Sequence, residues 1–267
     1  MTDSAASPPP PQPPPKPPNN LVGLGLLAVW LGLGALLVAQ PSGLATFAFV
    51  MTGWILAVMA HEFSHALIAY FAGDHTVKAK GYLSFDPRRY GDLGTSLVIP
   101  LLALALGGIG FPGGAVYLRN DLMRSRLWRS AASLAGPAAT FVVLLVISFG
   151  LSFWAGWGVA GAGPVALFEA FTLLGFLQAT ALILNLLPIP GLDGFNVLRP
   201  WLPGAWTGGL RKVEGLVMIG LLLLIFYVPG ASQQLFQAAA RLSATLGLDI
   251  GALREGWDNF HFWRPHG

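Results

Sequence analysis

His61-Glu62-Phe63-Ser64-His65 is the most informative stretch of this chain for its fold and its functional site. It places three ionisable side chains inside an apolar run. The run, residues 44–72, otherwise consists almost entirely of apolar and small residues. No Lys, Arg, Asp or Glu lies between Lys16 and Glu62. A charge in the hydrocarbon of a membrane costs a few kcal/mol or more, so ionisable residues within such a run indicate a functional site.

The spacing of the motif predicts a metal site. On a helix, residues four positions apart lie on the same face. Two imidazoles at that spacing, His61 and His65, can bind one Zn²⁺, and the intervening Glu62 can act as general base on a water molecule. Zinc is inferred from the type of ligand, because other divalent metals also bind sets of two histidines and one aspartate.

The composition is that of a membrane protein. Of the 267 residues, 54% are hydrophobic and only 10% are charged, and the mean hydropathy is +0.64. A typical soluble domain is about 25% charged. The net charge of +3 is small and its basic residues gather in short loops, which excludes a nucleic-acid-binding stripe. The chain has no cysteine, so any metal ligands must be His, Asp or Glu.

The apolar segments predict an all-α fold, a polytopic membrane helix bundle of five to six transmembrane helices. About 20 apolar residues are needed to cross a bilayer. The expected spans are residues 21–40, 44–72, 131–157 and 164–187, a shorter run at 215–228, and the segment 95–116. Basic loops flank 95–116 on both sides, and the segment contains Phe111-Pro112-Gly113-Gly114. A re-entrant hairpin that breaks there would keep both loops on one side, and a simple sixth span is the alternative.

With the hairpin, the positive-inside rule predicts that the N-terminus and the basic loops are cytoplasmic. We therefore expect a multi-pass protein of the cell (inner) membrane, embedded in the lipid bilayer. The motif then lies toward the cytoplasmic side of its helix. Residues 1–20 hold nine prolines between Ser7 and Pro18 and predict a disordered cytoplasmic tail. Residues 231–267 read as an amphipathic, aromatic tail that anchors at the membrane interface.

A third metal ligand is needed, because a catalytic zinc usually takes three protein ligands and leaves one position for water. Within residues 131–192 the only charged residue is Glu169, near the outer start of its span. The next acid, Asp193, follows the cytoplasmic end of an apolar segment, at the depth expected for the histidines. Pro188 and Pro190 cannot continue a regular helix, so the chain should unwind there and let Asp193 turn inward.

At this point the chain resembles the site-2 protease family of intramembrane zinc metalloproteases, in its compact bacterial branch without a PDZ domain. The resemblance rests on the H-E-x-x-H motif followed by Ala66, and on Asn185–Gly194, which matches the family's N-x-x-P-x-x-x-L-D-G pattern. Ala135-Gly136-Pro137-Ala138 resembles the A-G-P segment that opens the span between the two motifs. Gly91-Asp92-Leu93-Gly94-Thr95, continuing to Pro100, is similar to the same branch. The matches run in order from about Trp54 to Leu198.

The resemblance implies that the metal ligands are His61, His65 and Asp193, that Glu62 is the catalytic base, and that one Zn²⁺ binds per chain. It implies that Asn185 lies near the active site and helps to hold substrate or the oxyanion. It also implies a transmembrane metalloprotease domain over residues 21–230, with its core at about 44–200.

The substrates implied are transmembrane proteins, cleaved by metal-activated water. Phe195 and Asn196 depart from the family, which often has Gly and Arg there, and this bears on substrate fit. Two other functions stay open: a transporter or channel with a His/Asp metal site, and an inactive protease homologue.

Overall fold

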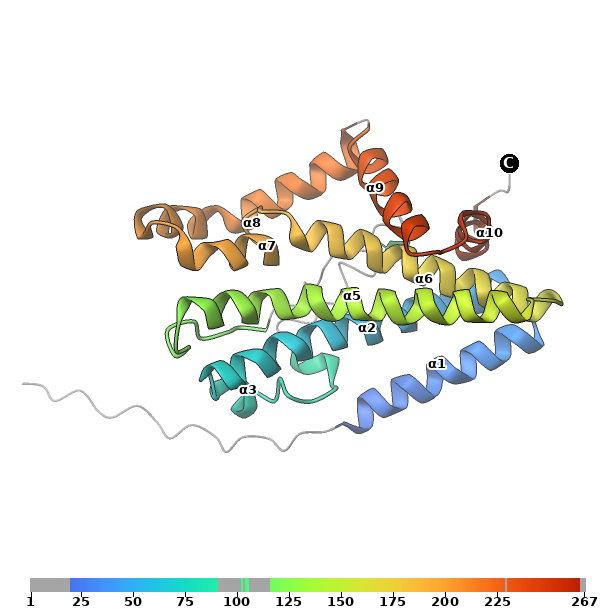
Figure 1. Ribbon diagram of the computed structural model, residues 1–267, viewed down its shortest axis with the longest axis horizontal. Helices are drawn as coiled ribbons and strands as arrows, with labels where there is room; N and C mark the ends of the chain where they lie inside the picture. The colour runs from blue at the N-terminus through green and yellow to red at the C-terminus, as the bar shows by residue number, and fades with distance from the viewer. Residues whose placement is uncertain (1–19, 91–101, 103, 106–115, 229, 265–267) are drawn as a thin grey trace, which may run out of the picture.

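The computed structural model describes residues 20–90, 102, 104–105, 116–228 and 230–264. Over these residues the chain is a bundle of helices without a strand (Figure 1). The predicted all-α polytopic bundle is thereby confirmed. The Pro-rich segment 1–20 and the hairpin or span predicted at 95–116 lie almost wholly outside the described residues.

Four of the described helices are long and apolar enough to cross a membrane. They are α1 (Leu21–Ala39), α2 (Gly43–Ala72), α5 (Arg126–Trp157) and α6 (Ala162–Leu186). A fifth candidate exists only if Val213–Tyr227 and Ala231–Thr245, which are bent by 86° relative to one another, count as one broken span. The described residues thus supply four or five of the five to six spans expected from the sequence.

Helix α5 begins five residues earlier than its apolar pattern starts. Ser125 caps it, since the Ser125 side chain accepts a hydrogen bond from the backbone N–H of Trp128. Arg126 and Arg129 lie in the first turn of the helix, and these two charges separate it from the continuous apolar run that begins at residue 131. The helix therefore extends beyond the apolar stretch into its basic loop.

Shorter helices connect and flank the spans. Between α2 and α5 lie α3 (Thr76–Ala79) and the 3₁₀ helix η1 (Pro87–Arg89). After α6 come α7 (Asp193–Leu198), η3 (Arg199–Trp201), α8 (Gly204–Tyr227), α9 (Ala231–Thr245) and α10 (Ile250–Phe260). Helix α8 is longer than the apolar run at 215–228 indicated, and the C-terminal tail forms two helices.

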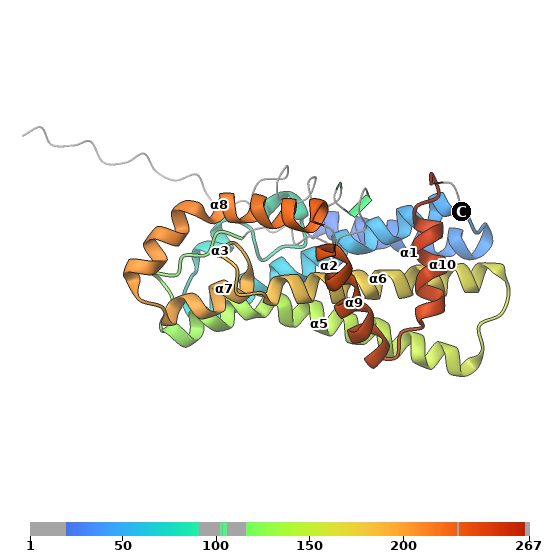
Figure 2. The same ribbon diagram turned by 90° about the horizontal axis from the view of Figure 1, so that it is seen from above.

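Helix α6 is the centre of the bundle, and α1 lies at its edge. In the most apolar stretch of each helix, 72% of the α6 residues are buried but only 17% of the α1 residues. Helix α6 packs against α2 and α5, and α9 and α10 also contact it (Figure 2). Trp54, Leu144 and Leu177 fill the core between these helices. Between membrane-spanning helices, such side chains stabilise the bundle through van der Waals packing, because lipid is as apolar as the core itself.

The C-terminal aromatic residues are partly inside the protein. Helix α10 packs against α2 and α6 at the end of the bundle opposite α7 (Figure 1). Phe260 and His261 are buried, and the ring of Phe260 lies 5.0 Å from that of Phe47. These two side chains therefore pack inside the protein, and aromatic composition does not distinguish a lipid-facing residue from one that packs on a neighbouring helix. Phe262 and Trp263 remain exposed.

Candidate metal centre

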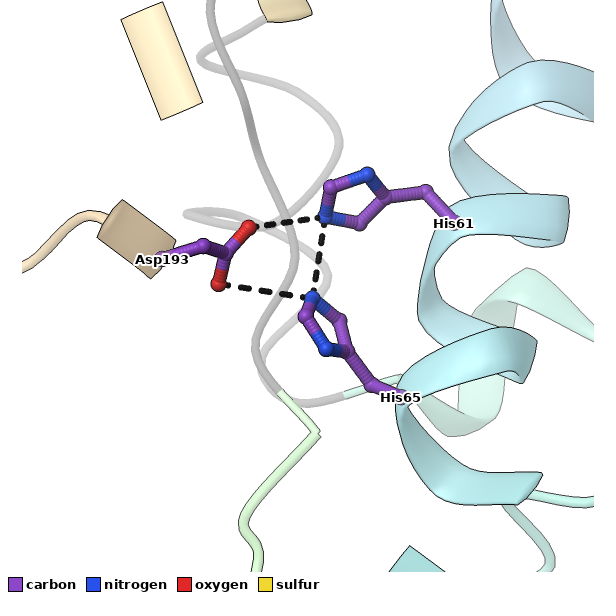
Figure 3. Close-up of side chains that lie close together, drawn as sticks. All are labelled: His61, His65 and Asp193. Atoms are coloured by element: carbon purple, nitrogen blue, oxygen red, sulfur yellow. Dashed lines mark hydrogen bonds and ion pairs between the residues drawn. The ribbon is translucent and has the colours of Figure 1, made fainter. Parts of the chain in front are cut away.

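Helix α2 brings the two histidines of the motif together. Its N-terminus is capped by Ser42, whose side chain accepts from the N–H of Ala45, and its long apolar sequence continues through the motif. His61 and His65 lie one turn apart on one face, both buried, with their Nε2 atoms 3.0 Å from each other (Figure 3). The helical spacing inferred from the sequence is confirmed.

The chain unwinds where the two prolines follow α6, and it turns Asp193 toward the histidines. Asp193 Oδ2 lies 3.1 Å from His61 Nε2, and its Oδ1 lies 3.3 Å from His65 Nε2. A side chain at Gly194 would meet the carbonyl oxygen of Leu186, so this close return of the backbone onto the end of α6 requires glycine. Asp193, which the sequence indicated as the third ligand, lies 128 positions after His65 in the chain, and the fold places it beside the two histidines.

These three residues fit a single metal ion. One ligand atom from each of His61, His65 and Asp193 lies within 4.8 Å of the others, as expected for atoms that surround one cation. Gly136 of α5 faces the same point: a Cβ built there would lie 2.2 Å from His65 Nε2 and 2.5 Å from His61 Nε2. The space in front of both imidazoles is therefore kept free by the absence of a side chain at position 136.

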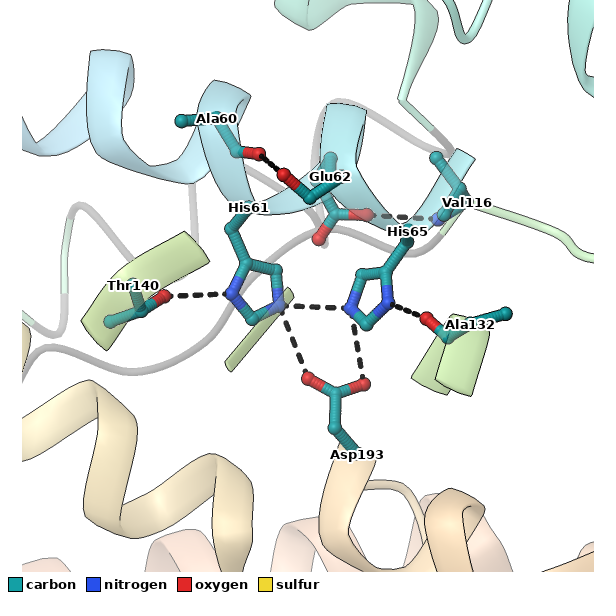
Figure 4. Close-up of polar contacts among 9 residues, drawn as sticks. Ala60, His61, Glu62, His65, Val116, Ala132, Thr140 and Asp193 are labelled. Atoms are coloured by element: carbon teal, nitrogen blue, oxygen red, sulfur yellow. Dashed lines mark hydrogen bonds and ion pairs between the residues drawn. The ribbon is translucent and has the colours of Figure 1, made fainter. Parts of the chain in front are cut away.

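Helix α5 also orients the imidazoles through their other ring nitrogen (Figure 4). His65 Nδ1 lies 2.7 Å from the carbonyl oxygen of Ala132, and His61 Nδ1 lies 2.9 Å from Thr140 Oγ1. A carbonyl only accepts, so Nδ1 of His65 is the donor, and in the neutral ring Nε2 then presents its lone pair to a metal. Such outer partners fix the tautomer and direction of metal-binding histidines.

Sequence reasoning missed Ala132 and Thr140. They lie four residues before and four residues after Gly136, so they share its helix face. The A-G-P segment together with helical periodicity was the signal that could have indicated them.

Glu62 is buried beside this cluster but does not join it (Figure 4). Its Oε2 accepts a hydrogen bond of 3.1 Å from the backbone N–H of Val116, the residue that follows the undescribed segment 106–115. This contact uses one carboxylate oxygen. It holds the side chain in a fixed direction next to the three ligand candidates.

A cavity of about 820 Å³ connects these groups with the polar loops. Glu62, both histidines and Asp193 line it, and Lys80, Asn120 and Asp121 lie at its rim. Asn185 of α6 is buried and lines the same cavity, as the resemblance implied. Among the described contacts, none joins Asn185 to the two histidines or to Asp193.

A polytopic helix bundle with two buried histidines, a partly buried aspartate beside them and an adjacent buried glutamate is the architecture of a membrane zinc metalloprotease. No family model matches the chain, and no solved structure does. The chain is 40% identical over 224 residues to "Putative zinc metalloprotease Rip2" of Mycolicibacterium smegmatis, covering 83% of each chain. It is 41% identical to the Rip2 protein of Mycobacterium tuberculosis over 71% of each chain. It is 26% identical to "Putative zinc metalloprotease YwhC" of Bacillus subtilis, over 72% of this chain and 86% of that one. The chain belongs to the site-2 protease family of zinc metalloproteases.

Proposed function

We propose that this zinc metalloprotease hydrolyses peptide bonds of transmembrane proteins within the bilayer. The observation that carries the proposal is the position of Glu62, His61 and His65: they lie buried in α2, a helix long and apolar enough to cross a membrane. A soluble substrate would have to enter the membrane to reach a site at that depth. A transmembrane segment reaches it directly, because it already lies in the hydrocarbon.

The metal is held in this proposal by His61, His65 and Asp193, one ion per chain. The three groups converge on one point, and Gly136 leaves that point free of side-chain atoms. Bound Zn²⁺ supplies Lewis-acid polarisation of a carbonyl group and activation of water at neutral pH. Three protein ligands leave a position open for the reacting groups.

Glu62 acts as the general base and then as the general acid. Its carboxylate takes a proton from the attacking water and delivers that proton to the leaving amine. The N–H of Val116 donates to Oε2, and in this proposal the other oxygen, Oε1, exchanges the proton. This contact also restricts the carboxylate to one orientation, which reduces the entropy cost of reaching the transition state.

Asn185 is proposed to stabilise the oxyanion or to hold the substrate backbone. Its amide is a hydrogen-bond donor on a buried wall of the cavity that also contains the metal ligands. A donor aimed at developing negative charge contributes several kcal/mol to transition-state stabilisation in other hydrolases.

The active site is proposed to open to the cytoplasm, in the cell (inner) membrane. The end of the bundle that carries Asp193 is basic, with Arg119 and Arg124 before α5, Arg126 at the first position of α5 and Arg199 after α7. Basic loops favour the cytoplasmic side. The polar rim of the cavity is formed by these same loops, which gives water a route to the site from that side.

Cleavage of a single-span reporter by the purified protein in liposomes tests the proposal. We expect the wild type to cut within the apolar span, as mapped by mass spectrometry, and Glu62→Gln to be inactive while retaining its fold. Glu169→Gln is the matched control: Glu169 lies in the spanning helix α6, where Asn259 donates to it 3.1 Å away, and its loss should leave cleavage intact. Cutting only outside the span, or full activity of Glu62→Gln, would contradict the proposal. If the protein were a transporter or an inactive homologue, neither the wild type nor any variant would cleave the reporter.

A further inference from the structure

The cavity that holds the metal ligands continues past them into the bundle. Its rim is polar and includes Lys80 and Asp121, but its opposite end reaches Trp54 and Gln178. Trp54 precedes His61 by seven residues, about 10 Å along the helix axis at 1.5 Å per residue. The proposed chemistry uses only the middle of this cavity and leaves the inner end unexplained.

Two helices build this inner end from residues at helical spacing. They are Trp54, Ala57 and His61 on α2 and Gln178, Ala181 and Asn185 on α6. Each set is spaced by three and then four residues, so each forms a continuous stripe along one helix face. The two stripes extend the wall of the metal centre inward, and the alanines leave room between the larger side chains.

The inner end carries two hydrogen-bond donors without partners. Gln178 Nε2 and Trp54 Nε1 are buried, and neither has a hydrogen-bond partner among the residues that the structure describes. Both residues are only 2% exposed. Leaving a buried donor unpaired costs about 1–3 kcal/mol. Native proteins rarely retain such groups unless a ligand or another function uses them.

Resting on the proposed function, we propose that Gln178 and Trp54 form a substrate subsite that binds the unwound backbone of the substrate through its carbonyl oxygens. A helical segment must unwind before its peptide bond can be cut, and its freed carbonyls then lack partners in a water-poor site. Each unsatisfied group there costs several kcal/mol. Two residues that line the cavity each carry such a buried N–H donor, which matches this need because a carbonyl is an acceptor only.

The geometry also predicts which part of the substrate is bound. An extended peptide advances about 3.3 Å per residue, so the 10 Å from His61 to Trp54 corresponds to about three residues. The subsite therefore takes the residue about three positions from the scissile bond, on the membrane-embedded side. The volume of about 820 Å³ accommodates several residues, far more than the roughly 30 Å³ of one water molecule.

Disulfide exchange maps the occupant of the inner end, because the natural chain has no cysteine. Ala181→Cys in a Glu62→Gln background places a single thiol beside Gln178. The probe is a single-span polypeptide with one cysteine, activated as a pyridyl disulfide and moved one position at a time. We expect crosslinking to peak about three residues from the bond that the wild type cuts. Phe149→Cys, an exposed position on α5, gives the background level.

The second measurement separates substrate binding from a structural role. Gln178→Met keeps the length of the side chain but removes the donors. We expect kcat/KM for the reporter to fall about 3- to 10-fold, the effect of one neutral hydrogen bond, while the Tm stays equal or rises. Thr180→Val is the control, because Thr180 is equally buried but bonds to its own helix at the carbonyl of Phe176, 2.9 Å away.

The outcomes distinguish the subsite from the proposed function. Crosslinking at Ala181→Cys that stays at the Phe149→Cys level, with a wild type that cleaves, would overturn the subsite alone and leave water as the occupant. A lower Tm with unchanged kcat/KM in Gln178→Met would likewise make Gln178 structural. A wild type that does not cleave the reporter would overturn the proposed function itself.

Discussion

Gly136→Ala adds a single methyl group at the point where the metal ligands converge. Its Cβ would lie 2.2 Å from His65 Nε2 and 2.5 Å from His61 Nε2, whereas real Cβ contacts essentially never fall below 3.0 Å. The nearer imidazole must therefore retreat by at least about 0.8 Å. Zinc–nitrogen bonds are about 2.0–2.1 Å long and tolerate changes of about 0.2 Å. The substitution thus displaces at least one ligand beyond its bonding range.

The expected loss of zinc affinity follows from that displacement. Changes to the outer partners of zinc ligands alone cost about 10- to 100-fold in affinity. Direct obstruction should cost at least about 100-fold, equivalent to about 2.8 kcal/mol at 1.4 kcal/mol per tenfold. Reporter cleavage should fall in parallel, because the metal is lost at the working zinc concentration.

The assay is zinc competition with a chelator, together with elemental analysis of the purified protein. Gly150→Ala is the matched control on the same helix, since a Cβ there meets nothing within 4 Å. It should keep full zinc affinity and gain up to about 1 kcal/mol from helix propensity. Zinc affinity of Gly136→Ala within twofold of the wild type would refute the assignment of the metal position.

Two further substitutions test the surroundings of the site. Thr140→Val removes the oxygen 2.9 Å from His61 Nδ1, so zinc affinity should fall about 10- to 100-fold in the competition assay, and Thr140→Ser should restore it. In the loop after α3, the Arg88 guanidinium holds the pKa of the Asp86 carboxyl below its ordinary value of 3.8. Asp86→Asn should therefore lower the Tm by a few degrees at neutral pH, and the deficit should vanish as the pH falls through and below 3.8 and the wild-type carboxylate is protonated. A deficit that is independent of pH would contradict this.

Much of the site was predictable because its signals are local in sequence. His61, Glu62 and His65 are specified by spacing within one helix in a segment where charge is costly. Asp193 could be predicted from the sequence because few acidic residues follow the spans and because the two prolines before it predict an unwound chain. The apolar lengths likewise predicted the four described spans, with helix ends that agree to within two residues except at the start of α5.

The remaining features depend on contacts between helices far apart in the sequence. Thr140 meets His61 across 79 residues, and the carbonyl of Ala132 meets His65 across 67. A threonine in an apolar helix or a backbone carbonyl does not by itself indicate such a role, and only the A-G-P segment combined with helical periodicity could have indicated this face of α5. The N–H of Val116 on Glu62 is likewise a backbone contact that no residue type encodes. The burial of Phe260 depends on where α10 docks, which aromatic composition does not determine.

Zinc content and cleavage measured on the same preparations test the central claim most directly. The wild type should carry one zinc per chain and cut the single-span reporter. Glu62→Gln should keep its zinc and lose cleavage, because the base is removed and the ligands stay. Asp193→Ala should lose both, because a ligand is removed. Zinc retained at one per chain in Asp193→Ala, or cleavage retained in Glu62→Gln, would contradict the account.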